Sequence, residues 1–383
     1  MNRAVITTIA GTGDAGCSGD GGPALAARLN GPFDLAFDPA GRLVFADTFN
    51  HRVRRIDLGR GTIETVAGSG TAGFAGDAGP ATLAQLREPY GIAIGADGAL
   101  FIVDRLNRRV RRVDPATGII ATIAGDGRAT SDGDDGPATA AGLMEPNDAC
   151  LDRTGARLFI ADVAGHRVRV VDLATGRIAT FAGIGAARDG RSAEPARPPD
   201  GVAGPGAAGD GGPGAAGDGG PGAAGDGGPA HAAALYGPRA VALAADGALL
   251  ILERNGCTLR RVDPATGIIT TIAGNGTRGA GGDGGPARAA EFAAPKELGI
   301  DRSGGILVVD TETHRIRRID PSGIVTTIAG TGVAGSADGP AATACLARPH
   351  GVAVGPDGAV YIGDTENHRI RRLDRIPPAR GPA

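Results

Sequence analysis

The sequence contains no tryptophan, only four cysteines, and only 3% aromatic residues among its 383 positions. None of the cysteines belongs to a Cys-x-x-Cys pair, so we expect free thiols and neither a structural zinc site nor a disulfide framework. No apolar run reaches the roughly 18 residues of a membrane helix, and the N-terminal residues lack the apolar core of a secretory signal. We therefore expect a cytoplasmic protein that does not enter a membrane.

Known catalytic motifs are also missing. The chain has no G-x-S-x-G, no H-E-x-x-H and no phosphate-binding loop. Its formal net charge of −3 gives no electrostatic reason to expect a polyanionic partner. Because aromatic stacking platforms are nearly absent as well, the composition disfavours binding of nucleic acid.

Glycine is abundant, with 68 residues, and it marks an internal repeat. A short β-branched segment ending in Ala-Gly occurs six times. The closing glycines are Gly11, Gly68, Gly125, Gly183, Gly274 and Gly330. A second signature, an acidic residue followed by a polar turn and an arginine-rich segment, also occurs six times. Each unit reads as four short strands joined by Gly, Asp and Pro turns, as in 91–94, 100–103, 109–113 and 119–124.

Six four-stranded sheets that stack radially predict an all-β, six-bladed β-propeller. The blade cores are expected at about 31–68, 88–125, 145–183, 237–274, 294–330 and 348–374. The last unit has three strands, and residues 5–11 supply an unattached fourth. We therefore expect the N-terminal strand to complete the sixth blade and close the ring of a single domain spanning 1–383. A low-complexity insertion at 186–228, with three copies of PGAAGDGG, is predicted to be a surface loop.

The pattern G-x-A-x followed by I-x-D-x-x-N-H-R-I-R-R, together with T-I-A-G and G-D-G-G-P-A segments, resembles NHL-repeat proteins. It is most similar to bacterial repeats that resemble the teneurin NHL domain, and it covers about residues 5 to 374. The resemblance implies a propeller. It does not imply one activity, because such rings host binding, scaffolding and enzymatic roles.

Strand order predicts which elements share a face of the ring. The long Gly/Asp loops, the Asp-x-x-Asn-His turns and the starts of the inner strands are expected on one face, which we call the long-loop face. The opposite, short-turn face receives only tight reversals such as Asp38–Gly41. We expect the ligand site on the long-loop face near the central channel, where concave pockets form.

Residues that repeat in every blade are predicted to serve the scaffold. Asp47 and its equivalents are expected to bond backbone amides of their own turn. The strand-three arginines, such as Arg54 and Arg55, are expected to form a solvated belt paired with acids. The Asp-Gly-Gly-Pro loops read as starts of short helices, with calcium binding as the alternative.

The two residues that open each inner strand differ from blade to blade, unlike the scaffold. The pairs are Phe33-Asp34, Tyr90-Gly91, Asn147-Asp148, Arg239-Ala240, Lys296-Glu297 and His350-Gly351. The second member alternates between acidic and small, and the first includes the only lysine of the chain. The predicted ligand-binding residues are Asp34, Tyr90, Asn147, Asp148, Arg239, Lys296, Glu297 and His350. The alternative is a channel mouth that varies freely and binds only water.

Three functions remain open on this evidence. The first is a non-catalytic binding or scaffolding propeller, a monomer without a cofactor, that holds a protein or small polar ligand on the long-loop face. The second is a metal-dependent lyase or lactonase-like hydrolase, which the resemblance to related six-bladed enzymes implies, with calcium or zinc at the channel mouth. The third is an RNA-binding NHL ring, which charge and composition disfavour.

Overall fold

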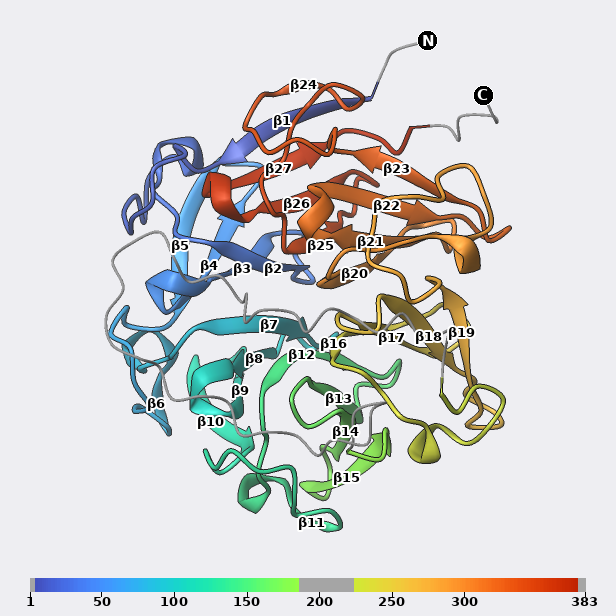
Figure 1. Ribbon diagram of the computed structural model, residues 1–383. Helices are drawn as coiled ribbons and strands as arrows, with labels where there is room; N and C mark the ends of the chain where they lie inside the picture. Colours follow the sequence, from blue (N-terminus) through green and yellow to red (C-terminus); the bar gives the residue numbers. More distant parts are fainter. Residues whose placement is uncertain (1–3, 186–223, 378–383) are drawn as a thin grey trace.

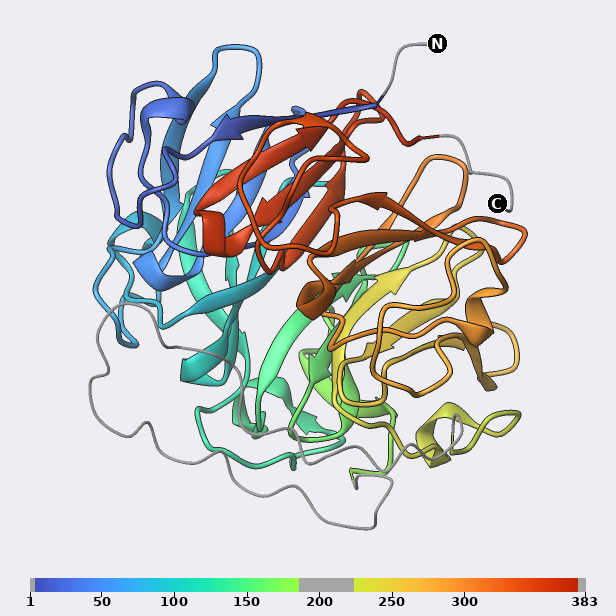
Figure 2. The same ribbon diagram turned by 45° about the horizontal axis from the view of Figure 1, so that its top comes forward.

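The computed structural model describes residues 4–185 and 224–377, which form six antiparallel sheets arranged in a ring (Figures 1 and 2). The first three blades contain β2 (Pro32–Phe37), β3 (Leu43–Asp47), β4 (Arg52–Asp57) and β5 (Thr62–Ala67); β7 (Pro89–Ile94), β8 (Leu100–Asp104), β9 (Arg109–Val113) and β10 (Ile119–Ala124); and β12 (Pro146–Leu151), β13 (Arg157–Asp162), β14 (Arg167–Asp172) and β15 (Arg177–Ala182). The next two contain β16 (Pro238–Leu243), β17 (Leu249–Glu253), β18 (Thr258–Val262) and β19 (Ile269–Ala273); and β20 (Glu297–Ile300), β21 (Ile306–Asp310), β22 (Arg315–Ile319) and β23 (Val325–Ala329).

The sixth blade joins the two ends of the chain. It contains β25 (Gly351–Val354), β26 (Val360–Asp364) and β27 (Arg369–Leu373), and β1 (Val5–Ala10) adds the outer strand (Figure 1). Strand β1 pairs antiparallel with β27, with Ile6 opposite Leu373. The predicted six-bladed propeller, closed by the N-terminal strand, is confirmed.

Two-residue strands and single 3-10 turns lie around the six blades. The two-residue strands β6 (Gly79–Pro80), β11 (Gly136–Pro137) and β24 (Gly339–Pro340) cover the outer strands of three blades. Single 3-10 turns follow the loop prolines, namely η1 (Ala24–Ala26), η3 (Ala81–Leu83), η5 (Ala138–Ala140), η6 (Ala230–Ala232) and η7 (Ala287–Ala289), and others follow the second strands, namely η2 (Thr48–Asn50), η4 (Arg105–Asn107), η8 (Thr311–Thr313) and η9 (Thr365–Asn367). None of the helices in the described part of the chain is long and apolar enough to cross a membrane.

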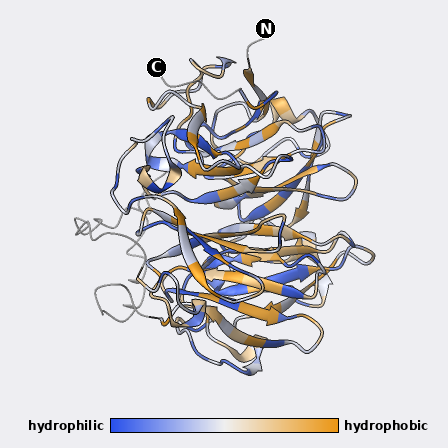
Figure 3. Ribbon diagram, turned by 90° about the vertical axis from the view of Figure 1, so that its right-hand side faces the viewer, coloured by the Kyte–Doolittle hydropathy of each residue, from blue (hydrophilic) through white to orange (hydrophobic). Residues whose placement is uncertain are grey.

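The hydrophobic core is divided among the blade interfaces. Each of six apolar clusters draws its residues from two successive blades, as where Ala46 and Val53 of the first blade pack with Ile92 and Ile102 of the second. In Figure 3 the hydrophobic residues accordingly lie along the strands that face neighbouring blades. A single blade cannot bury both of its faces by itself, so each face packs against a neighbouring blade. The ring must close to bury the outer faces of the first and last blades.

A buried arginine clasp, repeated in every blade, holds the long loops. In the second blade the Arg111 side chain is fully buried and donates to Asp77 Oδ1 at 2.6 Å and to the Gln85 carbonyl at 2.9 Å. Its Nη1 also lies 3.8 Å from Asp104, whose Oδ1 accepts the Arg87 amide at 2.7 Å. The equivalent buried arginines are Arg54, Arg169, Arg260, Arg317 and Arg371.

The clasp corrects two expectations. Asp47 and its equivalents accept a backbone amide from the loop that precedes their own inner strand, as Asn30 donates to Asp47 at 2.7 Å. From its own turn Asp47 accepts only the side-chain amide of Asn50, and not a backbone amide. One arginine of each third strand is buried: Arg54 is fully buried, whereas Arg55 is part-exposed and pairs with Glu64. The continuous basic belt is therefore not formed, because the fold uses one arginine of each third strand as an internal tie.

The turn histidines tie each blade to the next. His51 Nδ1 accepts the backbone amide of Glu88 at 3.2 Å, and His314 Nδ1 accepts that of Arg348 at 3.0 Å. His166 and His368 bond to the amides of Gly237 and Gly31 in the same way. These imidazoles serve the scaffold, and each fixes the residue just before an inner strand.

We expect Asp364→Ala to lower the free energy of unfolding by about 3 kcal/mol, the lower end of the range for a broken buried ion pair, because Arg371 loses one of its two carboxylate partners and the Ala347 amide loses its acceptor. Asp364 Oδ2 lies 2.8 Å from Arg371 Nη1, and both side chains are fully buried. Urea unfolding measures the change. The control is Arg60→Ala, which removes an ion pair whose arginine side chain is 82% exposed and should change stability little. Equal effects of the two substitutions would show that the clasp does not stabilise the fold.

Candidate functional site

The variable pairs lie at irregular positions of the inner strands. In β12 the register shifts between Pro146 and Asp148, and β2, β7 and β16 shift at the same place. A bulge of this kind disrupts the ladder locally and redirects side chains, and bulges are common beside functional sites. The pairs of these four blades are therefore not bound by the regular alternation of a strand, whereas Glu297 and Gly351 begin regular ladders in the fifth and sixth blades.

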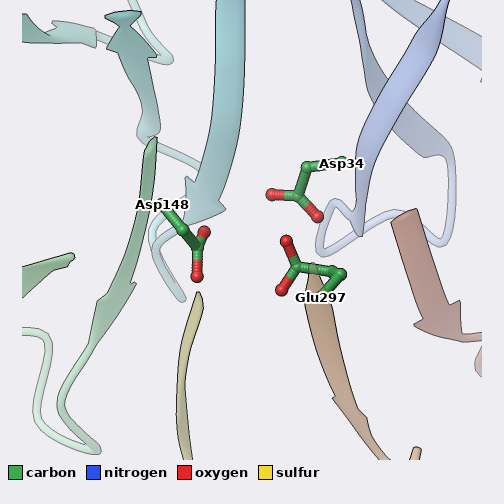
Figure 4. A group of neighbouring side chains, drawn as sticks. All are labelled: Asp34, Asp148 and Glu297. Carbon is green, nitrogen blue, oxygen red and sulfur yellow. The ribbon is translucent and has the colours of Figure 1, made fainter. Parts of the chain in front are cut away.

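Three acidic side chains meet in the central channel. Asp34, Asp148 and Glu297 come from β2, β12 and β20, the inner strands of alternate blades, and their carboxyl groups face one another (Figure 4). One oxygen from each lies within 4.8 Å of the others. The residues are 8%, 4% and 8% exposed, so the carboxyl groups are held away from bulk water. We call this group the channel triad.

Backbone amides hold the triad in place. Asp34 accepts the amides of Leu35 and Ile92, both at 2.7 Å, so it links its own inner strand to that of the next blade. Asp148 accepts the Val241 amide at 2.8 Å and makes the same link to the fourth blade. Glu297, which is one methylene longer, accepts the Leu298 amide at 2.8 Å.

The alternation of acidic and small residues follows from this packing. A Cβ atom on Gly91 would lie 2.6 Å from Asp148 Cα, and one on Gly351 would lie 2.0 Å from the Phe33 carbonyl oxygen. Both distances are too short for a side chain. An acidic blade therefore needs a small residue in the blade beside it, and only three of the six positions can point a carboxyl group at the axis.

Burial and mutual repulsion raise the pKa values of the triad. Burial raises the pKa of Asp148 to about 7, although hydrogen bonds from backbone amides and the positive charge of Arg239 act to lower it. Burial, followed by the charge of Asp148, places the pKa values of Asp34 and Glu297 well above their ordinary ranges. Three carboxylates this close cannot all ionise readily, so the triad shares protons near neutral pH.

The first members of the pairs pack together on the long-loop side of the triad. The Phe33 ring contacts Tyr90 and His350 at centroid distances of 4.3 and 4.1 Å, and Arg239 lies over Tyr90 at 4.7 Å. Lys296 Nζ lies 2.7 Å from His350 Nε2. Arg239 also bonds to Asn147. All six residues are buried, so they form a layer across this side of the channel.

A cavity of about 1120 Å³ extends from the triad in the other direction. It is bounded by the ends of the inner strands, including Ile94, Leu151 and Leu243, and by the short turns at 95–97 and 152–155, and it continues between the second and third blades, where residues of the third and fourth strands such as Arg112 and Ile123 line it. We expected a pocket on the long-loop face. The cavity instead opens toward the short-turn face, because the bulky first members of the pairs fill the other end.

The structure thus divides the eight candidate residues into two groups. Asp34, Asp148 and Glu297 line the cavity, whereas Tyr90, Asn147, Arg239, Lys296 and His350 belong to the buried layer behind them. Sequence reasoning missed the cavity walls, including Cys150, whose pKa is raised by burial. In the sequence, these wall residues are marked only by the apolar run that follows each variable pair. Ordinary core strands show the same pattern.

Comparison with known proteins identifies the type of repeat in the sixth blade. A family model of the NHL repeat matches residues 346–373, which include the strands β25 to β27. An NHL repeat is present in the sixth blade. The chain is 26% identical over 370 residues to protein SUPPRESSOR OF QUENCHING 1 of Arabidopsis thaliana, covering 93% of this chain and 31% of that protein. It is 26% identical over 375 residues to NHL repeat-containing protein 2 of Bos taurus, covering 87% and 45%. The chain thus spans less than half of either relative.

Solved structures share the fold at low identity. An auxiliary nutrient binding protein from Bacteroides thetaiotaomicron superposes with a TM-score of 0.65 at 19% identity, covering 97% of this chain and 76% of that one. A gluconolactonase from Xanthomonas campestris gives a TM-score of 0.57 at 14% identity, covering 98% and 90%. At this identity the likeness establishes the propeller alone.

The triad predicts a pH dependence of stability without added metal. The folded protein binds the Asp148 proton with a pKa of about 7, against an ordinary value of 3.8, so stabilisation is present at low pH and lost as pH rises through 7. Thermal melts in chelator should show a midpoint that falls from pH 5.5 to 8.5. In Asp148→Asn the fall should be smaller, since one buried charge is removed while the oxygen that accepts the Val241 amide remains. Parallel curves for the two proteins would refute the shared-proton model.

Proposed function

We propose that this protein is a binding propeller whose channel triad holds a divalent cation, with calcium as the first choice, and whose cavity receives a small ligand at that ion. The observation that supports it most is the convergence of three buried carboxyl groups at the closed end of a cavity of about 1120 Å³. Natural ligand pockets are concave and carry a few placed polar groups in this way.

The donor set fits a hard cation. Asp34, Asp148 and Glu297 offer only oxygen atoms, which calcium prefers, and carboxylates that bind through one or both oxygens suit its flexible coordination. Zinc favours nitrogen and sulfur ligands. The nearby His350 has Nε2 directed to Lys296 and Nδ1 to the Arg348 carbonyl, so it is already engaged. A divalent ion would also replace the shared protons and relieve the repulsion among the carboxylates.

The arginines of the third strands weaken the case for RNA. A phosphate-binding face needs solvated cations and stacking aromatics. Arg54, Arg111 and their equivalents are buried in the clasp. Their part-exposed neighbours Arg55, Arg318 and Arg372 are paired with Glu64, Asp301 and Asp357.

Calcium should raise the thermal midpoint of the wild-type protein at pH 8, because an ion that binds only the folded state stabilises it by about 2.7 kcal/mol at 100 times its dissociation constant. Asp148→Asn and Glu297→Gln should abolish most of this increase. The matched control is Asp97→Asn, which removes an exposed acid at the cavity rim and should leave the increase intact. Calorimetric titration gives the stoichiometry, expected to be one. Calcium binding that survives both triad substitutions would disprove the site.

Metal-dependent hydrolysis is the second candidate, and the channel triad is the feature that favours it. A calcium ion held by its three carboxylates would polarise the carbonyl group of a lactone in the cavity. The test is turnover of a panel of sugar and aliphatic lactones by the calcium-loaded protein. Hydrolysis that is lost in Asp148→Asn and kept in Asp97→Asn would favour the enzyme; no turnover across the panel would leave the binding function.

A further inference from the structure

Arg239 is buried without an ion pair among the described residues. It is 4% exposed, its guanidinium group donates to Asn147 Oδ1, and it lies 4.7 Å from the centroid of the Tyr90 ring. The six buried arginines of the clasp, by contrast, each pair with an aspartate of a long loop. A buried charge without a partner is costly, so another charged group must compensate Arg239.

Arg239 is coupled to the channel triad. Val241, two residues after it, donates its amide to Asp148 Oδ2 at 2.8 Å. Asn147, which accepts from the guanidinium group, directly precedes Asp148. Burial raises the pKa values of Asp148 and Glu297, and the positive charge of Arg239 acts to lower both. The guanidinium charge is therefore felt at two of the three carboxyl groups.

Lys296, the other cation of the layer, belongs to a separate set of charges. Its Nζ donates to His350 Nε2 at 2.7 Å, so this imidazole is neutral and donates from Nδ1 to the Arg348 carbonyl at 2.9 Å. Although burial acts to raise the pKa of Glu312, hydrogen bonding to Arg348 and the charges of Arg348 and Lys296 lower it. Arg348 also pairs with Glu366 at 2.9 Å. Two acids and two bases thus balance one another here without the triad.

The remaining charges at the channel match a divalent ion. The three ionised carboxylates of the triad, one divalent ion and the guanidinium group of Arg239 carry no net charge together. A trivalent ion would leave one buried positive charge uncompensated. Without Arg239, the trivalent ion would instead be the one that neutralises the triad. A cation beside the site therefore distinguishes ions by their charge, because Coulomb energy is proportional to charge.

Resting on the proposed function, we propose that Arg239 is an internal counter-ion of the channel triad and makes the site selective for divalent over trivalent cations. Arg239 belongs to the layer that fills the long-loop end of the channel, so it acts on the ion through its charge and does not bind it. The alternative is a structural role, in which Arg239 only holds Asn147 and the inner strand β16 in place. Loss of a structural contact would affect every ion alike.

Competition between calcium and terbium(III), a trivalent ion of similar size, tests the inference in the full chain. Terbium luminescence titrated with calcium at pH 6.5 gives the ratio of the two affinities. Displaced protons cancel in this ratio, because both ions occupy the same carboxylates. In the wild type, terbium should bind no more than about tenfold more tightly than calcium.

Substitutions of Arg239 separate its charge from its contacts. In Arg239→Met the ratio of terbium to calcium affinity should rise about tenfold, since one positive charge beside the site is removed. Arg239→Gln, which keeps a donor for Asn147, should show the same rise. Arg239→Lys retains the charge and should stay within about threefold of the wild type. Calcium binding by each variant shows that it is folded.

Arg105→Met is the matched control. Arg105 lies 4.6 Å from the centroid of the same Tyr90 ring, but it pairs with Glu88 and Glu145 at 3.1 and 2.8 Å. Its loss removes a cation from the same ring without removing the counter-ion of the triad. The ratio should therefore change less than about threefold.

The results distinguish this inference from the function on which it rests. Absence of calcium binding to the wild type would overturn the proposed function. Calcium binding with the same terbium preference in Arg239→Met and the wild type would overturn the inference alone. So would an equal rise in Arg239→Lys or Arg105→Met, or a wild-type preference for terbium above about tenfold.

Discussion

The architecture depends on a buried arginine that occurs once in every blade. It pairs with an aspartate of the long loop in all six blades, and in all but the third it also lies within 4 Å of the acid that ends the second strand, as Arg371 pairs with Asp338 and Asp364. A guanidinium group has several donors in a fixed plane, so it can bind both carboxylates and loop carbonyls at once. The long loops, which have few apolar residues to bury, are held to the blade in this way.

The same acids also fix the position of the inner strands that line the channel. The acid of each clasp accepts an amide from the loop before the inner strand, and a turn histidine of the preceding blade accepts the next amide in four of the six blades. Together these bonds set where an inner strand begins and how its bulge projects the variable pair. The channel triad is thus carried by the scaffold, although it contributes nothing to the clasp. Its carboxyl groups remain buried because strand amides solvate them.

Much of this was predictable from particular residues. Repetition of the Asp-x-x-Asn-His-Arg segment identified the blades, and the missing fourth strand of the last unit identified β1 as its partner. The alternation of acidic and small residues at the variable pairs marks Asp34, Asp148 and Glu297, which are three of the eight ligand-binding residues predicted from the sequence. The ordering of the pair was not predictable, because two adjacent residues at a bulge can face either end of a channel. Side-chain volume decides the outcome: Phe33, Tyr90 and Arg239 fill one end, and the shorter acids border the open one.

The sequence by itself determined the number of blades, the closure of the ring and the positions that vary, because each of these is recorded in the period of the repeat. Only the tertiary structure decided that three carboxyl groups from residues more than 100 positions apart share one volume, that the cavity faces the short turns, and that one arginine of each third strand is internal. The physical reason is that burial and electrostatic coupling depend on the distance between blades. That distance follows from packing around the whole ring and from no local pattern.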